Sequence, residues 1–234
     1  MAIALQTLAH PSELATASDT QAPLLAAVNL TGERGGRLLF RRLSFALQPG
    51  QVVWLRGRNG RGKTSLLRLL AGLSTPTEGA VHCDAVALPV AGPAWRERLL
   101  FMAHANALKD DLSVLECLRF LAQLQGRSAT PSQLSTALER LGVAPLATRP
   151  VRTLSQGQRR RVALARLALP QPPSVWLLDE PFDALDDDGI GRLNGLLSEH
   201  AAAGGSTLLT SHQALLLQNP VPVVLDLDLQ ALQG

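Results

Sequence analysis

A glycine-rich loop between an expected strand and an expected helix constrains this 234-residue chain more than any other feature. Residues 57–64 read GRNGRGKT and fit the pattern G-x4-G-K-[ST]. The preceding QVVWLRG is typical of a strand, and the leucines of SLLRLLAGL, residues 65–73, have helical spacing. In that context the glycines let backbone N–H groups surround phosphate oxygens at a helix N-terminus. The loop therefore predicts a phosphate-loop nucleotide-binding fold.

Each residue of this loop is a candidate for nucleotide binding. Lys63 is expected to reach the β and γ phosphates, and the Thr64 hydroxyl to hold Mg²⁺. Lys63 stands out because it and Lys109 are the only lysines among 22 basic residues. The predicted ATP-binding residues of the segment are Gly57, Arg58, Asn59, Gly60, Arg61, Gly62, Lys63, Thr64 and Ser65.

A second candidate element is the apolar run VWLL, which two acids follow. A continuous apolar run is typical of a strand buried on both faces of a parallel sheet, and the ligand site of such sheets lies at the carboxyl ends of the strands. Asp179 is therefore predicted to bind the metal, through a water or directly. Glu180 is predicted to polarise the water that attacks the γ phosphate.

The order of elements predicts an α/β fold with a largely parallel sheet and an antiparallel β region at its edge. Residues 1–22 lack a sustained period and are expected to be a poorly ordered extension, which leaves residues 23–234 as one domain. Residues 97 to about 145 are predicted to be mostly helical, so a helical subdomain over about 97–150 is expected. A helix over 156–169, an apolar strand over 175–179, a helix over 188–203 and a strand over 206–212 complete the alternation.

Composition excludes several classes of protein. A net charge of +3 over 234 residues is too thin for a nucleic-acid footprint, and 3% aromatic residues leave few rings for base stacking. Cys83 and Cys117 fit no metal spacing, and a chain of this size needs no disulfide. No window reaches the roughly 18 apolar residues of a membrane span. Because the positive charge is thin and aromatic residues are few, we expect no nucleic-acid partner.

The segment LSQGQ identifies a family resemblance. Ser155 is expected to cap a helix, and Gly157 to expose backbone N–H groups, which would form a second anion site. The segment resembles the LSGGQ signature of ATP-binding-cassette ATPases, and it stands in that family's order, between the phosphate loop and the acid-ended strand. The resemblance implies that the signature contacts the γ phosphate held by the opposite subunit of a homodimer. The signature residues are Leu154, Ser155, Gln156, Gly157 and Gln158.

The resemblance implies further roles. Asp186 resembles the residue that lies at the dimer interface, and His212 resembles the switch histidine that contacts the γ phosphate. His104 occupies the place where a glutamine usually binds Mg²⁺, and Arg34 the place where an aromatic residue usually stacks on adenine. A guanidinium can stack on a base with less apolar area, so less adenine-selective binding is expected; the alternative is a solvated turn residue.

Within this family, the segments ERGGRLLFRRLSFAL and LSQGQRRRVALARL are similar to the haem-exporter ATPases of bacterial cytochrome c maturation. The resemblance implies an ATPase homodimer beneath separate integral membrane subunits, at the cytoplasmic face of the inner membrane. ATP hydrolysis would then power haem export or the release of a haem-loaded chaperone. Short antibiotic or peptide exporter ATPases share most of these segments, and they remain the alternative.

Two other classes fit the sequence less well. Cassette proteins that act on ribosomes or DNA usually carry two cassettes or a long coiled-coil insertion, and neither occurs here. A phosphate-loop kinase or GTPase does not explain LSQGQ. The amphipathic stretch over residues 112–124 has two interpretations, packing in the subdomain core or a docking face for a membrane subunit.

Overall fold

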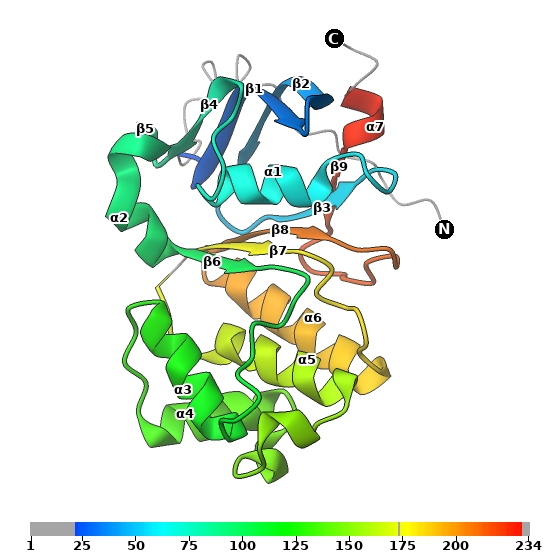
Figure 1. Ribbon diagram of the computed structural model, residues 1–234. Helices are drawn as coiled ribbons and strands as arrows, with labels where there is room; N and C mark the ends of the chain where they lie inside the picture. Colours follow the sequence, from blue (N-terminus) through cyan, green and yellow to red (C-terminus); the bar gives the residue numbers. More distant parts are fainter. Residues whose placement is uncertain (1–21, 173, 231–234) are drawn as a thin grey trace.

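A five-stranded parallel sheet forms the centre of the molecule, which a computed structural model describes over residues 22–172 and 174–230 (Figure 1). The predicted extension over residues 1–22 lies outside the described residues, apart from residue 22. The α/β class with a parallel core is confirmed. In spatial order the strands are β6 (Leu99–Met102), β7 (Val175–Leu178), β8 (Ser206–Thr210), β3 (Val52–Arg56) and β9 (Val223–Asp226).

The antiparallel strands form a separate four-stranded sheet and do not extend the parallel one. Helix α1 (Lys63–Leu70) lies between the two sheets in Figure 1. Its buried leucines join the hydrophobic core that both sheets share, so the phosphate loop is mounted on a helix held from two sides. The strands of the antiparallel sheet, in spatial order, are β2 (Arg37–Leu47), β1 (Leu25–Arg34), β4 (Glu78–Cys83) and β5 (Val86–Ala87).

The helices of the second half cover the other face of the parallel sheet (Figure 1). Strand β7 shows why its sequence is a continuous apolar run: Val175 and Leu177 point into the core around α1, while Trp176 and Leu178 point into the core around these helices. Among the residues that the structure describes, no helix is long and apolar enough to cross a membrane. The helices here are α3 (Val114–Leu124), α4 (Pro131–Arg140), α5 (Gln156–Leu164) and α6 (Asp187–Ala202).

Two further helices and the 3-10 turns complete the described fold. Helix α2 (Leu88–Arg98) precedes β6, and α7 (Leu227–Gln230) follows β9. The 3-10 turns span Ala144–Leu146, Val151–Thr153 and Ala165–Ala168, and the last of these ends the helix predicted over 156–169. Helix α3 follows a capping box of Ser113 and Glu116. Most of the apolar side of the 112–124 stretch packs into the core, whereas Leu124 at its end is exposed.

One element of the sequence analysis is wrong. Residues 99–102 were expected to be helical, and they form strand β6 of the parallel sheet. The run LLFM is too short for periodicity to distinguish a strand from a buried helix. Its pairing with β7, about 76 residues further along the chain, decides the outcome. Position 104 consequently follows a sheet strand, at the sheet edge where the carboxyl ends meet.

His200 is a buried histidine whose charge state affects stability. Its ring stacks on Trp176 with centroids 3.7 Å apart, and Nε2 lies 2.9 Å from the carbonyl oxygen of Ser174. Burial lowers the pKa of His200 from its ordinary value of 6.5 to about 4, although hydrogen bonds to the backbone oppose the shift. The folded protein therefore holds this ring neutral where the unfolded chain would protonate it.

We expect the contribution of His200 to the free energy of unfolding to fall by about 3 kcal/mol between pH 6.5 and pH 4. The contribution is fully present above the unfolded pKa and is lost as pH falls toward the folded one. Urea unfolding of wild type and His200→Phe across this range measures it. The variant keeps a stacked ring and should show a flatter profile. Parallel profiles of the two proteins would contradict the assignment.

Candidate functional site

The phosphate loop connects β3 to α1 at the carboxyl end of the parallel sheet. Gly62 precedes the first turn of α1 with φ 102°, a conformation that favours glycine, and a Cβ atom there would lie 2.9 Å from Cβ of Leu39. No side chain of the described residues caps the helix, so its first N–H groups point to a place where a ligand can bind. Lys63 Nζ donates a hydrogen bond to the Gly57 carbonyl at 2.7 Å. This arrangement can hold an anion.

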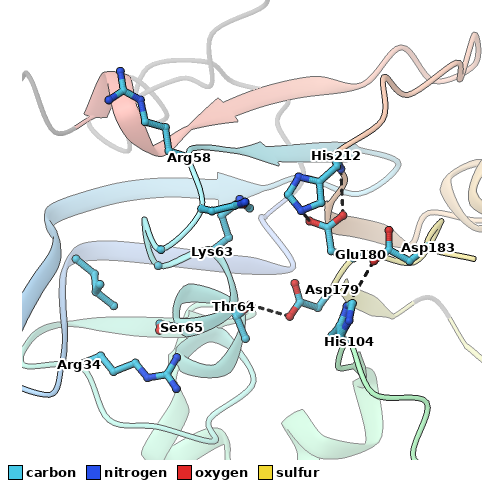
Figure 2. A pocket seen from close by; sticks show the side chains of 14 residues that line it. Arg34, Arg58, Lys63, Thr64, Ser65, His104, Asp179, Glu180, Asp183 and His212 are labelled. Carbon is cyan, nitrogen blue, oxygen red and sulfur yellow. Dashed lines mark hydrogen bonds and ion pairs between the residues drawn. The ribbon is translucent and has the colours of Figure 1, made fainter.

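A cleft of about 310 Å³ lies beside this loop (Figure 2). Residues from segments far apart in the sequence meet there because β3, β6, β7 and β8 are parallel and end at one edge. The cleft brings together most of the predicted nucleotide and metal residues. Its lining is Arg34, Leu39, Arg58, Asn59, Gly60, Gly62, Lys63, Thr64, Ser65, His104, Asp179, Glu180, Asp183 and His212.

Gly57 and Arg61, both predicted to bind ATP, do not line this cleft. Arg61 Nε lies 3.3 Å from Asp228 Oδ1 and donates to the Leu227 carbonyl at 3.3 Å. Asp228 also accepts from the backbone N–H of Arg58 at 2.9 Å. The Arg61 side chain therefore connects the loop to α7.

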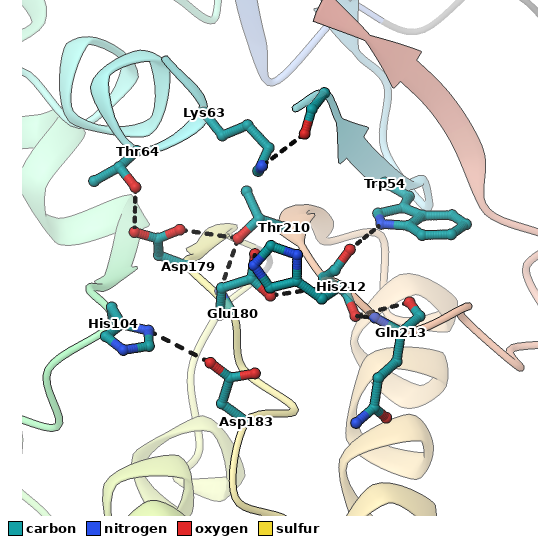
Figure 3. Close-up of polar contacts among 12 residues, drawn as sticks. Trp54, Lys63, Thr64, His104, Asp179, Glu180, Asp183, Thr210, His212 and Gln213 are labelled. Atoms are coloured by element: carbon teal, nitrogen blue, oxygen red, sulfur yellow. Dashed lines mark hydrogen bonds and ion pairs between the residues drawn. The ribbon is translucent and has the colours of Figure 1, made fainter. Parts of the chain in front are cut away.

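Two carboxylates follow β7 and are almost fully buried (Figure 3). Asp179 accepts hydrogen bonds from the Thr64 hydroxyl at 2.8 Å and from the Thr210 hydroxyl at 2.9 Å. The Thr210 oxygen accepts in turn from the backbone N–H of Glu180 at 2.8 Å. Asp179 thus joins the phosphate loop, β7 and β8, and its carboxylate faces the cleft beside Thr64.

Glu180 and His212 lie side by side in the cleft lining (Figure 3). The His212 backbone N–H donates to Glu180 Oε2 at 3.0 Å, and His212 Nε2 lies 3.4 Å from Oε1. Glu180 has φ 50°, which is uncommon for a residue with a side chain. Opposite this pair, His104 Nδ1 lies 3.6 Å from Asp183 Oδ2. The Glu180 carboxylate, positioned beside the His212 imidazole in this way, can accept a proton from a bound water.

The LSQGQ segment lies elsewhere. Ser155 caps α5 in a capping box with Gln158, and a Cβ atom at Gly157 would lie 2.8 Å from the Ala184 carbonyl oxygen. Ser155, Gly157, Gln158 and Asp186 line a separate hollow of about 430 Å³, while Leu154 is buried and Gln156 is exposed. The structure therefore does not bring the signature residues together with Lys63 in one chain.

Asp186 has a structural partner in this hollow. It accepts from the Gly189 backbone N–H at 3.0 Å, which caps α6, and it pairs with Arg161 on α5. The hydrogen bond from Arg161, followed by that from Gly189, lowers the pKa of the Asp186 carboxyl below its ordinary value. Asp186 is therefore held as an anion between the two helices.

Sequence reasoning missed Asp183, which lines the cleft, and Thr210, which does not line it but supports it. The Thr210 hydroxyl is fully buried, donates to the Asp179 carboxylate and accepts from the Glu180 backbone N–H, while Asp183 pairs with His104. Thr210 stands at the end of its strand as Asp179 follows the end of the neighbouring one, and parallel pairing of those strands is the signal that could have identified it. Asp183 had only its place three residues after Glu180 as a signal.

This parallel sheet, with a phosphate loop and an acid-ended strand meeting at one edge, defines the class of phosphate-loop ATPases. A sequence model of the family "ABC transporter" matches residues 40–183. A solved structure, the dimeric post-hydrolysis state of the ATP-binding cassette MJ0796 bound to ADP and Pi, superposes with a TM-score of 0.70 at 24% identity and covers 81% of this chain and 88% of that one. That likeness shows the fold.

Curated relatives narrow the family. The cytochrome c biogenesis ATP-binding export protein CcmA of Aromatoleum aromaticum is 46% identical over 88% of this chain and 96% of its own length. The protein of that name in Pseudomonas syringae pv. syringae is 47% identical over 88% and 95%. The chain therefore belongs to the ABC transporter family, as an ABC-type ATPase, and within it to the cytochrome c biogenesis ATP-binding export proteins.

Proposed function

We propose that this chain is the ATP-hydrolysing subunit that powers a membrane complex of cytochrome c maturation, in which hydrolysis drives haem export or the release of a haem-loaded chaperone. The observation that carries the proposal is the cleft in which Lys63, Thr64, Asp179, Glu180 and His212 meet at the carboxyl edge of the parallel sheet. The similarity to curated cytochrome c biogenesis export proteins supports the particular process.

The cleft residues divide the work of hydrolysis. Lys63 and the N–H groups of the loop bind the phosphates of ATP, and this stabilises the charge that develops on the transferred group. Glu180 accepts the proton of the attacking water, and the His212 backbone N–H and ring hold its carboxylate toward the cleft. His212 also lines this cleft, and its ring contacts the γ phosphate of bound ATP. Arg34, at the opposite end, stacks on the base.

The donor set of the cleft fits Mg²⁺. The Thr64 hydroxyl and an Asp179 carboxylate oxygen lie 2.8 Å apart beside the phosphate loop, and hydroxyl and carboxylate oxygens are ligands that Mg²⁺ prefers. We therefore place the ion at Thr64 and Asp179, with His104 on the same side of the cleft. When bound, Mg²⁺ neutralises phosphate charge. Thr210 fixes the other Asp179 oxygen and so orients the carboxylate.

The active unit that we propose is a homodimer. Ser155 and Gly157 line a hollow that shares no residue with the Lys63 cleft, so a γ phosphate held by one chain would need the signature of a second chain. The related cassette that was solved as a dimer supports this arrangement. Asp186, held at the signature hollow by Arg161, lies at the proposed interface. Separate integral membrane subunits complete the complex, and the chain binds them peripherally at the cytoplasmic face of the inner membrane.

The proposed process is tested by its partners. The chain, tagged at its amino terminus, is purified from detergent-solubilised membranes of its source, and the copurifying proteins are identified by mass spectrometry. We expect integral membrane proteins of cytochrome c maturation in the eluate, and none when the tag is expressed alone. Membrane subunits of an antibiotic or peptide exporter in their place would contradict the proposal and leave the ATPase assignment intact.

A further inference from the structure

Arg160 is a buried arginine on α5, five residues after the Ser155 cap, with 2% of its surface exposed. Burial lowers the pKa of its guanidinium, while the charges of Asp183, Asp179 and Glu180 oppose the shift. A fully buried cation is costly unless its N–H groups are satisfied. The partners of Arg160 should therefore indicate why it is there.

The guanidinium of Arg160 donates to two segments that frame the cleft. On the β7 side, Nε donates to the Pro181 carbonyl at 3.2 Å, and Nη2 donates to the carbonyls of Asp179, at 3.2 Å, and Glu180. On the β6 side, Nη1 donates to the His104 carbonyl at 3.3 Å and to Asn106 Oδ1 at 2.9 Å. Among the described residues, no carboxylate oxygen is hydrogen-bonded to this side chain.

These contacts fall where the backbone most needs support. Three consecutive carbonyls, those of residues 179–181, turn toward Arg160 because Glu180 adopts φ 50°. A residue with a side chain keeps such a conformation only where its surroundings determine it. The turn also sends the Glu180 carboxylate to the opposite side, where His212 holds it. Arg160 therefore lies behind the cleft and does not line it.

We propose that Arg160 is a positioning residue for ATP hydrolysis, which joins the signature helix to both walls of the cleft by fixing the main chain at Glu180 and at His104. The inference rests on the proposed function of the cleft. Because Ser155 caps α5 and Arg160 lies on it, a displacement of the signature moves the arginine that holds Glu180. The planar fork of arginine suits this role, since its five N–H groups reach several acceptors at once, whereas a lysine ammonium is a single point.

Arg166 offers a matched control. It lies six residues further along, is also buried, and donates to a backbone carbonyl, that of Phe101 at 2.8 Å, but it donates no hydrogen bond to residues 179–181 or to residues 104–106. Loss of either guanidinium should lower stability through an unsatisfied buried carbonyl. Only the loss of Arg160 should affect catalysis selectively.

The experiment compares wild type, Arg160→Gln, Arg160→Lys and Arg166→Gln in the purified membrane complex. Thermal unfolding reports stability, and ATPase kinetics give kcat and KM. We expect both Arg160 variants to lower kcat roughly 10- to 100-fold with KM within about twofold, since the lost contacts position the base and touch no nucleotide atom. Arg166→Gln should keep the wild-type kcat while its unfolding temperature falls.

Each other outcome overturns the inference or the proposal beneath it. If Arg160→Gln does not fold, Arg160→Lys decides alone, because it keeps the charge and loses the fork. A folded Arg160 variant with wild-type kcat, or an equal loss of kcat in Arg166→Gln, means that Arg160 serves stability only. Wild-type protein without ATPase activity would instead refute the proposed function of the cleft.

Discussion

Replacement of Glu180 by glutamine is expected to lower ATP turnover by roughly 10²- to 10⁴-fold while ATP binding is retained. The reason is that the carboxylate acts as a base on the attacking water, whereas Lys63 and the loop N–H groups bind the nucleotide. Glutamine keeps the size of the side chain and can still accept from the His212 backbone N–H, so the local fold should persist. With ATP and Mg²⁺ present, the variant should accumulate as a dimer.

Two measurements check this expectation, phosphate release for turnover and size-exclusion chromatography for the dimer. Glu199→Gln is a suitable control, because Glu199 is an exposed glutamate on α6 that pairs with Arg140 and lies outside the cleft. It should hydrolyse ATP as wild type does. A Glu180→Gln protein that remains monomeric with ATP and keeps wild-type turnover would show that Glu180 is not the base.

Replacement of Lys63 by alanine is expected to abolish turnover and to weaken ATP binding roughly 10- to 100-fold, the loss of one charge-assisted hydrogen bond to phosphate. Both effects should occur together, because the ammonium contacts phosphate in the bound and in the transition state. Lys109→Ala removes the other lysine, which is exposed and outside the cleft, and should leave both quantities unchanged. Titration with a fluorescent ATP analogue measures affinity. Unchanged affinity in Lys63→Ala would refute the assignment.

The same variant tests whether two chains share one site. In a mixed dimer of Lys63→Ala with Ser155→Arg, one composite site carries both lesions and the other carries neither. Hydrolysis should therefore recover on mixing, to a level well above that of either variant alone. Cross-linking must show that mixed dimers form. Their formation without recovery would count against a shared site.

The sequence predicted the parts of the site that are local in the chain. The loop at residues 57–64, the acids after β7 and the cap at Ser155 each combine turn, cap and apolar-run signals within a few residues. Parallel strands bring the loop and the acids to one edge, so the meeting of these two parts in the cleft also followed from the fold class, whereas Ser155 lines a separate hollow.

The parts that the sequence did not predict depend on contacts between distant segments. Strand β6 is defined by its pairing with β7, and Thr210 by its hydroxyl between Asp179 and Glu180. Arg160 was one arginine among several in QRRR, and only its burial beneath residues 179–181 distinguishes it. Arg61 is the reverse case. It is a motif residue, but its side chain turns to α7 and pairs with Asp228. Side-chain direction of this kind is not encoded in a motif.

Helix α7 is attached to the phosphate loop, although the two are far apart in the sequence. Asp228 and the Leu227 carbonyl accept hydrogen bonds from Arg58 and Arg61 of the phosphate loop. Helix α7 thus stabilises a loop some 170 residues earlier in the chain. A label, fusion or deletion that disturbs α7 would therefore also disturb the phosphate loop. Removal of α7, residues 227–230, would take both of these contacts away from the loop.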